Sequence, residues 1–143
     1  RAPAAETPAA PVASPSNEIA NDISEAKTTI GHMKNIVSQV KKRTTSLKQG
    51  VRNVQKAAEK TQQLYTTAKT KYAATKKIII RATQLPTSLD EALKYADNLA
   101  KLDNVTDVNV LEMNVGELSN SAEKVSMHAA PVVAFSATRE GGK

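Results

Sequence analysis

The sequence predicts an all-α protein, an elongated antiparallel three-helix bundle with coiled-coil-like packing. Three observations support this prediction: a long seven-residue apolar repeat, a proline that ends it, and a scarcity of large aromatic side chains. The 143 residues include one Phe, no Trp and three Tyr. Because aromatic residues usually supply much of the buried area of a compact globule, their scarcity favours long helices that pack closely through small side chains. The length fits a single domain.

Residues 1–16 are predicted to form a disordered arm that precedes the bundle. This segment is rich in Ala, Pro and Ser and holds four of the six prolines of the chain. Such a composition buries too little apolar surface to offset the entropy lost on ordering. We therefore expect a helical bundle over residues 17–130, followed by a flexible tail over residues 131–143.

A repeat with alternating steps of four and three runs between residues 19 and 82, and sixteen of its 19 positions are apolar if Tyr is counted so, while the other three are Thr. None of these positions is charged, although the surrounding segment is rich in Lys and Arg. A seven-residue repeat of this length is typical of coiled-coil-like packing and predicts which face is buried. The repeat positions are Ile19, Ile23, Ala26, Ile30, Met33, Val37, Val40, Thr44, Leu47, Val51, Val54, Ala58, Thr61, Tyr65, Ala68, Tyr72, Thr75, Ile79 and Ala82.

Gly50 divides this repeat, and we predict helices over about residues 17–49 and 51–84. Glycine costs about 1 kcal/mol inside a helix and is favoured just past a helix end. The basic residues that precede Gly50 also suit a helix C-terminus. The repeat nevertheless continues through Gly50 without a slip. One unbroken helix, in a long hairpin that oligomerises, therefore remains an open alternative.

A third helix is predicted to begin at Ser88 and to end near residue 129. Pro86 ends the preceding helix, and Ser88–Glu91 has the pattern of a capping box. Two apolar stripes follow, and they are about one residue out of register. Because the slip falls in residues 103–107, we expect a kink, a stutter or a short loop there.

The net charge of +6 is distributed unevenly along the chain. Residues 51–84 carry eight Lys and Arg against one Glu, whereas residues 88–128 carry eight acids and three Lys. One interpretation is that a basic helix lies antiparallel to an acidic one, so that the charges set the register. The other interpretation is a basic stripe that binds nucleic acid or an anionic lipid. Its residues would be Arg52, Lys56, Lys60, Lys69, Lys76 and Arg81.

No catalytic, cofactor-binding or metal-binding residue is predicted. Cys is absent, and His32 and His128 are too isolated to complete a zinc site. We also expect neither histidine to lie beside a nucleophile. The scattered glycines form no phosphate-binding loop, and no apolar run reaches the roughly 18 residues of a membrane span. Asn104 begins a glycosylation sequence, which would matter only in a secreted protein.

The predicted helices are rich in alanine, lack cysteine and follow a Pro/Ala-rich segment, and this layout resembles a known family. This layout over residues 17–129, with the segments Lys56–Lys60 and Tyr72–Thr75, resembles the invariant and alanine-rich surface proteins of African trypanosomes, chiefly the insect-stage and metacyclic ones. The resemblance implies an ectodomain held at the cell surface by a C-terminal glycolipid anchor. The chain itself displays neither a leader nor an anchor signal, and no functional residue carries over from the family.

These observations lead to three functional hypotheses. The first is a non-enzymatic, rod-like surface ectodomain of a parasite coat, which shields the cell or contacts a host or vector ligand as a monomer or weak oligomer. The second is an intracellular, cytoplasmic binding module for nucleic acid or anionic lipid. The third is a coiled-coil scaffold that pairs with another helical chain. None of the three requires a cofactor.

Overall fold

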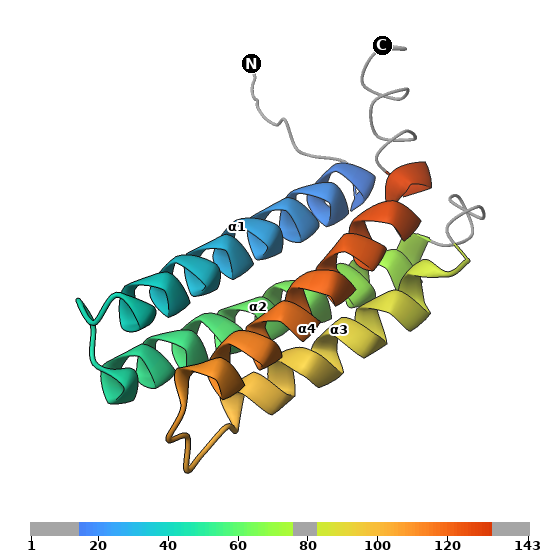
Figure 1. The fold of residues 1–143 in the computed structure, drawn as a ribbon. Coiled ribbons are helices and arrows are strands. Elements are labelled where there is room, and N and C mark those ends of the chain that lie inside the picture. The colour runs from blue at the N-terminus through green and yellow to red at the C-terminus, as the bar shows by residue number, and fades with distance from the viewer. Residues whose placement is uncertain (1–14, 76–82, 133–143) are drawn as a thin grey trace, which may run out of the picture.

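The computed structural model describes residues 15–75 and 83–132. This part of the chain is all-helical, which confirms the predicted fold class, but it contains four long helices rather than three (Figure 1). A three-helix bundle is not confirmed, because residues 101–107, where a kink, a stutter or a short loop was expected, form a loop that divides the third predicted helix into two. The helices are α1 (Pro15–Lys41), α2 (Leu47–Thr75), α3 (Leu85–Ala100) and α4 (Val108–His128).

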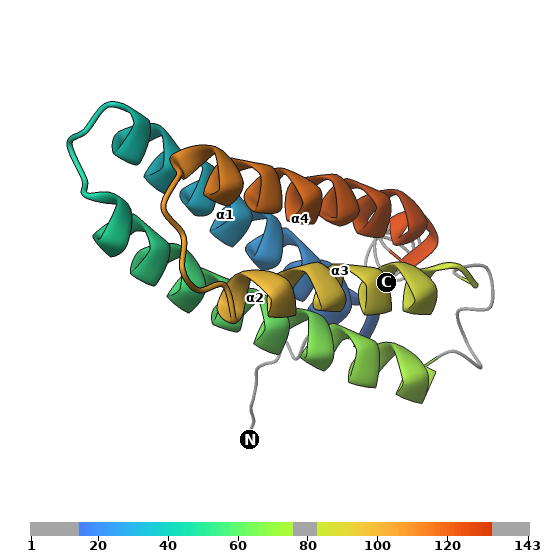
Figure 2. The same ribbon diagram turned by 60° about the horizontal axis from the view of Figure 1, so that its bottom comes forward.

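The four helices pack in a closed ring, in which α1 contacts α2, α2 contacts α3, α3 contacts α4, and α4 contacts α1. Consecutive helices run antiparallel, as both views show (Figure 1 and Figure 2). The loops 42–46 and 101–107 therefore lie at the same end of the bundle, which we call the loop end. The start of α1 and the end of α4 lie at the opposite end.

The seven-residue repeat predicted the buried face correctly along most of α1 and α2. The exceptions within the described residues gather at the loop end, where Thr44 is exposed and Leu47 and Val51 are half-buried. The side chains of residues 75, 79 and 82 lie outside the described residues. The repeat positions that are buried are Ile19, Ile23, Ala26, Ile30, Met33, Val37, Val40, Val54, Ala58, Thr61, Tyr65, Ala68 and Tyr72.

The chain breaks between α1 and α2 as predicted, but at residues 42–46 rather than at Gly50. Arg43 takes a left-handed conformation, with φ of 65°. The N–H of Thr44 bonds the carbonyl of Gln39 at 3.0 Å, and the N–H of Arg43 bonds that of Val40 at 3.0 Å. This pair of bonds is the Schellman ending of a helix. Because glycine is the usual residue at its left-handed position, an arginine there gave no signal in the sequence.

Gly50 lies in the first turn of α2, where its role is to allow close approach. A Cβ added to Gly50 would overlap Cγ2 of Val40 on α1. Ser46 begins the helix by accepting a hydrogen bond on its Oγ from the N–H of Gln49 at 3.1 Å. The glycine therefore brings the last turn of α1 against the first turn of α2, and it does not end a helix.

The third predicted boundary also needs correction, because α3 begins at Leu85 and Ser88 does not cap it. Pro86 lies in the first turn, where its missing N–H costs nothing. Leu85 is completely buried, so the helix starts early enough to place this side chain in the core. The N–H of Ser88 already bonds the carbonyl of Gln84 at 3.1 Å.

The register slip between the two C-terminal stripes corresponds to the loop between α3 and α4. Asn104 in this loop has φ of 53°, a left-handed conformation that Asn tolerates well. Asp107 then caps α4 by accepting a hydrogen bond from the N–H of Asn109 at 2.9 Å. The side-chain amide of Gln55 on α2 donates to the carbonyl of Leu102, which fastens the loop to the bundle.

The predicted terminal segments are largely outside the described residues. Of the arm over residues 1–16, only residues 15 and 16 are described, and they belong to α1. Of the tail over residues 131–143, residues 131 and 132 are described, and Val132 is buried against the core.

Candidate functional site

Three lysines of α2, namely Lys60, Lys69 and Lys71, are paired with acids of neighbouring helices. Lys60 lies 3.4 Å from Glu25 on α1, and Lys69 lies 2.5 Å from Asp90 on α3. The Lys69 pair agrees with the interpretation that a basic helix lies beside an acidic one. The same helix also pairs with α1, which the charge count of the sequence did not predict.

Lys71 on α2 makes the least exposed of these ion pairs. Its Nζ lies 3.0 Å from Asp22 and 3.1 Å from Glu18, both on α1. Burial lowers the pKa of Lys71, but the hydrogen bonds and charges of the two carboxylates outweigh burial and leave that pKa raised. The network stabilises the end of the bundle that lies opposite the loop end.

The sides that α4 shares with its neighbours are also neutralised. Lys27 on α1 lies 3.5 Å from Glu123, and Lys124 on α4 lies 3.7 Å from Glu91 on α3. Exposed pairs of this kind contribute only about 0–1 kcal/mol each to stability. Their main consequence is electrostatic, because they leave little net charge along the sides of the described bundle.

The loop end differs, because four cations there have no acidic partner among the described residues. Lys42, Arg43, Lys48 and Arg52 are all exposed, and none forms an ion pair within residues 15–75 and 83–132. We call these four residues the basic tip. Its origin is visible in the sequence, since no Asp or Glu occurs between residues 25 and 59.

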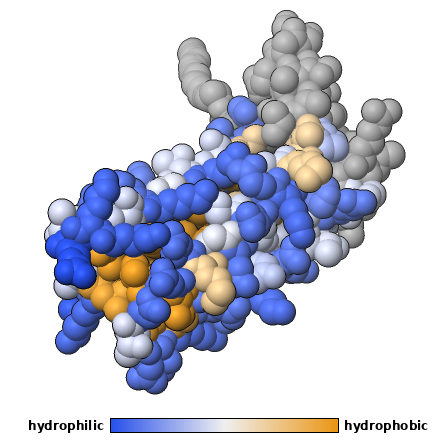
Figure 3. All heavy atoms as spheres, in the orientation of Figure 1, coloured by the Kyte–Doolittle hydropathy of each residue, from blue (hydrophilic) through white to orange (hydrophobic). Residues whose placement is uncertain are grey.

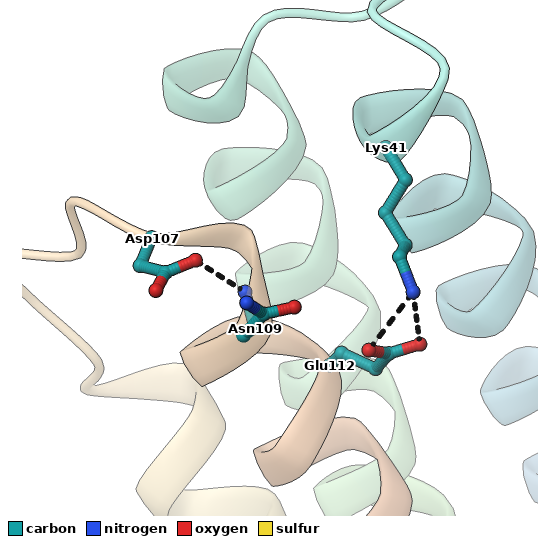
Figure 4. Close-up of polar contacts among 4 residues, drawn as sticks. All are labelled: Lys41, Asp107, Asn109 and Glu112. Atoms are coloured by element: carbon teal, nitrogen blue, oxygen red, sulfur yellow. Dashed lines mark hydrogen bonds and ion pairs between the residues drawn. The ribbon is translucent and has the colours of Figure 1, made fainter.

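The acids that share the loop end are mostly engaged elsewhere. Glu112 on α4 accepts two hydrogen bonds from Lys41, at 2.9 and 3.1 Å, and the carboxylate of Asp107 caps α4 (Figure 4). Asp97 accepts a hydrogen bond from Gln62 and pairs with Lys101, both at 3.1 Å. Asp107 keeps its charge while it caps α4, and Asp103 is exposed in the same loop, but the four cations of the basic tip outnumber these two acids.

An apolar patch lies at the same end. It consists of Leu47 and Val51 on α2 and Val108 on α4, all half-buried against the core. Figure 3 shows apolar surface at this end with hydrophilic side chains around it. The patch exists because α3, with 16 residues, is shorter than α2, with 29 residues. The chain leaves α3 near Gln55 of α2, so the first two turns of α2 have no helical neighbour on the side that faces α3.

The predicted basic stripe is therefore divided by the structure. Lys60 and Lys69 are neutralised, Arg52 belongs to the basic tip, and Lys56 is exposed without an ion pair among the described residues. Lys76 and Arg81 lie outside the described residues. Sequence reasoning missed Lys42, Arg43 and Lys48, although the acid-free run could have indicated them.

A second polar arrangement, between Ser88 and His128, was not expected. The antiparallel packing of α3 and α4 brings Oγ of Ser88 against Nδ1 of His128, so the expectation that neither histidine lies beside a nucleophile was wrong. Ser88 is only 5% exposed, which leaves no room for a substrate at its Oγ. No described carboxylate hydrogen-bonds the imidazole to orient it. The contact therefore fits a hydrogen bond that joins two helix ends.

The described residues contain no other arrangement suited to chemistry. A shallow polar hollow of about 540 Å³ lies along α2, lined by Glu59, two Gln and two Thr, and a groove of about 250 Å³ lies between α1 and α4. No three His, Asp or Glu gather where they could hold a metal ion. Within the same residues, no helix has the length and apolar character needed to cross a bilayer.

Asn104 is exposed in the loop between α3 and α4. An exposed loop is where a glycosylation site has to lie, so the position is compatible with that modification. Glycosylation itself stays a prediction that depends on secretion.

Comparisons of the chain with protein-family models, curated proteins and solved structures found no match. The resemblance to trypanosome surface proteins therefore stays a prediction from composition and layout.

Proposed function

We propose that the protein is a non-enzymatic binding module that engages an anionic partner through the basic tip. One observation carries the proposal: four exposed cations without acidic partners gather at the loop end, while Lys27, Lys60, Lys69 and Lys124 along the sides pair with the protein's own acids and only Lys34, Lys56 and Lys94 on the described helices do not. Clusters of one charge sign attract and orient oppositely charged ligands.

The basic tip is also unfavourable for folding, which supports a functional role. An L-residue in the left-handed conformation of Arg43 costs about 1–2 kcal/mol, a cost that glycine would avoid. Lys48 lies in the first turn of α2, where the helix dipole disfavours positive charge. Residues that lower local stability are expected at functional sites. An anion bound at the basic tip would offset the unfavourable interaction between the cation and the helix dipole.

The non-enzymatic part of the proposal is supported by the surroundings of Ser88 and His128. A nucleophile has to reach its substrate, whereas the hydroxyl of Ser88 is enclosed between two helices. The hollow on α2 offers amides, hydroxyls and one carboxylate, and no base beside a nucleophile.

Heparin affinity chromatography tests the proposal. We expect the protein to be retained at low salt and released as salt rises. A variant with Lys42, Arg43, Lys48 and Arg52 changed to Gln should elute at much lower salt. The matched control changes the four paired lysines Lys27, Lys60, Lys69 and Lys124 to Gln, which alters the net charge equally. Equal loss of retention in both variants, or no retention of the wild type at low salt, would contradict a localised site.

A second candidate function is the rod-like surface ectodomain, and one observation favours it. The start of α1 and the end of α4 lie at the end opposite the basic tip (Figure 1). The 27 residues of α1 extend about 40 Å, so a chain tethered beyond α4 would present the tip about that far from its anchor. The complete reading frame tests this candidate, which requires a leader and a C-terminal anchor signal.

A further inference from the structure

We infer that the anionic partner is a lipid bilayer with acidic headgroups, on which the loop end docks end-on without crossing it. This inference rests on the function proposed above and names the partner class. It is carried by the position of the apolar patch directly beside the basic tip.

Charged and apolar residues alternate along the first two turns of α2. Leu47 is followed by Lys48, and Val51 by Arg52, so both patch residues on α2 have a cation next to them in the chain, whereas Val108 on α4 follows Asp107. A bilayer offers two layers that match this arrangement, anionic headgroups outside and hydrocarbon beneath. Lys and Arg can extend their charged ends to the headgroups while apolar side chains penetrate further.

The apolar patch and the tyrosines make other polyanions a poorer match. A sulfated glycan or a nucleic acid backbone would use the cations and leave Leu47 and Val51 in water. Proteins that bind single-stranded nucleic acid also stack bases on exposed aromatic rings. Tyr65 and Tyr72 are buried in the core, and Tyr95 lies on α3, outside the basic tip.

The distribution of acids favours an end-on orientation. Glu18 and Asp22 near the start of α1, and Asp90 near the start of α3, lie at the end opposite the basic tip. Glu18 and Asp22 share Lys71, and Asp90 pairs with Lys69, so these groups leave no excess of cations at that end. Among the described residues, an anionic surface therefore attracts the loop end more strongly than the opposite end. Asp103 and Asp107 in the loop between α3 and α4 are exposed acids at the loop end, but residues 34–56 contribute seven Lys and Arg and no acid.

Co-sedimentation with vesicles tests this inference, using phosphatidylcholine alone and phosphatidylcholine with 30% phosphatidylserine. We expect binding to the anionic vesicles only. Each cation near such a surface contributes about a fivefold change in partitioning, so the four-residue tip variant should lose binding by more than a hundredfold, whereas the paired-lysine control should stay within about threefold of wild type. Changing Leu47 and Val51 to Ser should weaken binding about tenfold.

A fluorescence measurement tests the docking geometry without disturbing the patch. Because the chain has no Cys, an environment-sensitive dye can be attached through Thr44→Cys in the exposed loop, with Thr67→Cys on the side of α2 as the matched control. We expect a blue shift on anionic vesicles for position 44 and none for position 67. This pair of labels remains informative even if the Leu47/Val51 variant fails to fold.

The outcomes separate the inference from the proposed function. Retention on heparin without binding to anionic vesicles overturns the bilayer inference and leaves an anionic partner of another class. Failure to bind both heparin and vesicles overturns the proposed function. Equal binding to neutral vesicles, or equal spectral shifts at positions 44 and 67, also overturns the inference, because charge or end-on docking is then not involved.

Discussion

The substitution Gly50→Ala tests the close contact between Gly50 on α2 and Val40 on α1. The new methyl group would overlap Cγ2 of Val40. Valine has essentially one side-chain rotamer in a helix, so this methyl cannot turn away easily, and Val40 is only 7% exposed. Overpacking of this kind costs about 1–3 kcal/mol. Replacing glycine within a helix returns about 1 kcal/mol, so we expect Gly50→Ala to destabilise the protein by about 1 kcal/mol net.

A double-mutant cycle separates the two opposing contributions. In a Val40→Ala background the overlap disappears, and Gly50→Ala should then stabilise the protein by about 1 kcal/mol. The coupling free energy between the two positions should therefore be about 2 kcal/mol, within the range for residues in contact. Urea unfolding followed by helical circular dichroism measures all four free energies, and the single Gly50→Ala change should lower Tm by about 4 °C.

Two other glycines provide the matched controls. A Cβ at Gly31 on α1 or at Gly116 on α4 would meet no atom within 4 Å. Gly31→Ala and Gly116→Ala should each stabilise the protein by about 0.5–1 kcal/mol. If Gly50→Ala were as stabilising as these controls, or if the coupling with Val40 were near zero, the argument for a close approach at Gly50 would be refuted.

Four further predictions concern buried polar groups and the turn. The hydroxyl of Tyr65 is buried without a hydrogen-bond partner among the described residues, so Tyr65→Phe should stabilise the protein by about 1 kcal/mol in urea unfolding at pH 7; a loss of stability would reveal a bridging water. Burial, with a smaller contribution from Glu123, raises the pKa of Tyr65 in the folded state. Above about pH 10, the Tyr65 hydroxyl therefore ionises only in the unfolded chain, which favours unfolding. The free energy of unfolding should fall with pH by about 1.4 kcal/mol per pH unit more steeply in wild type than in Tyr65→Phe. Ser88→Ala removes the contact with His128 and should cost about 1 kcal/mol, measured in the same assay; an unchanged stability would show that the contact contributes nothing. Arg43→Gly relieves the left-handed backbone and should raise the free energy of unfolding by about 1 kcal/mol while weakening retention on heparin, and a destabilised variant would contradict the strain assigned to this residue.

The sequence predicted the buried face of the fold because burial in a helix follows a one-dimensional period. Ile30, Met33 and Val54, for example, are buried where the repeat places them. The helix ends were harder to predict, since they depend on residues that break the usual preferences. Arg43 ends α1 in a conformation typical of glycine, and the capping pattern at Ser88 is overridden by the burial of Leu85.

The candidate site could be predicted only in part, because it is defined by charges that remain after pairing. Pairing depends on which helices lie side by side. Lys60 was expected in a basic stripe, but the contact between α1 and α2 places Glu25 beside it. Arg52 remained unpaired, since α3 ends before reaching it and brings no acid there. The apolar patch has the same origin, and no sequence period indicates a difference in helix length.

The ring of contacts between consecutive helices has a consequence for how the chain folds. Three of the four helix pairs join neighbours in the sequence, and only the pairing of α1 with α4 closes a long loop. Topologies dominated by such local contacts cross their folding barrier in microseconds to milliseconds. We therefore expect the two longest helices, α1 and α2, to associate early, and the docking of α4 against α1 to be the slowest part of the reaction.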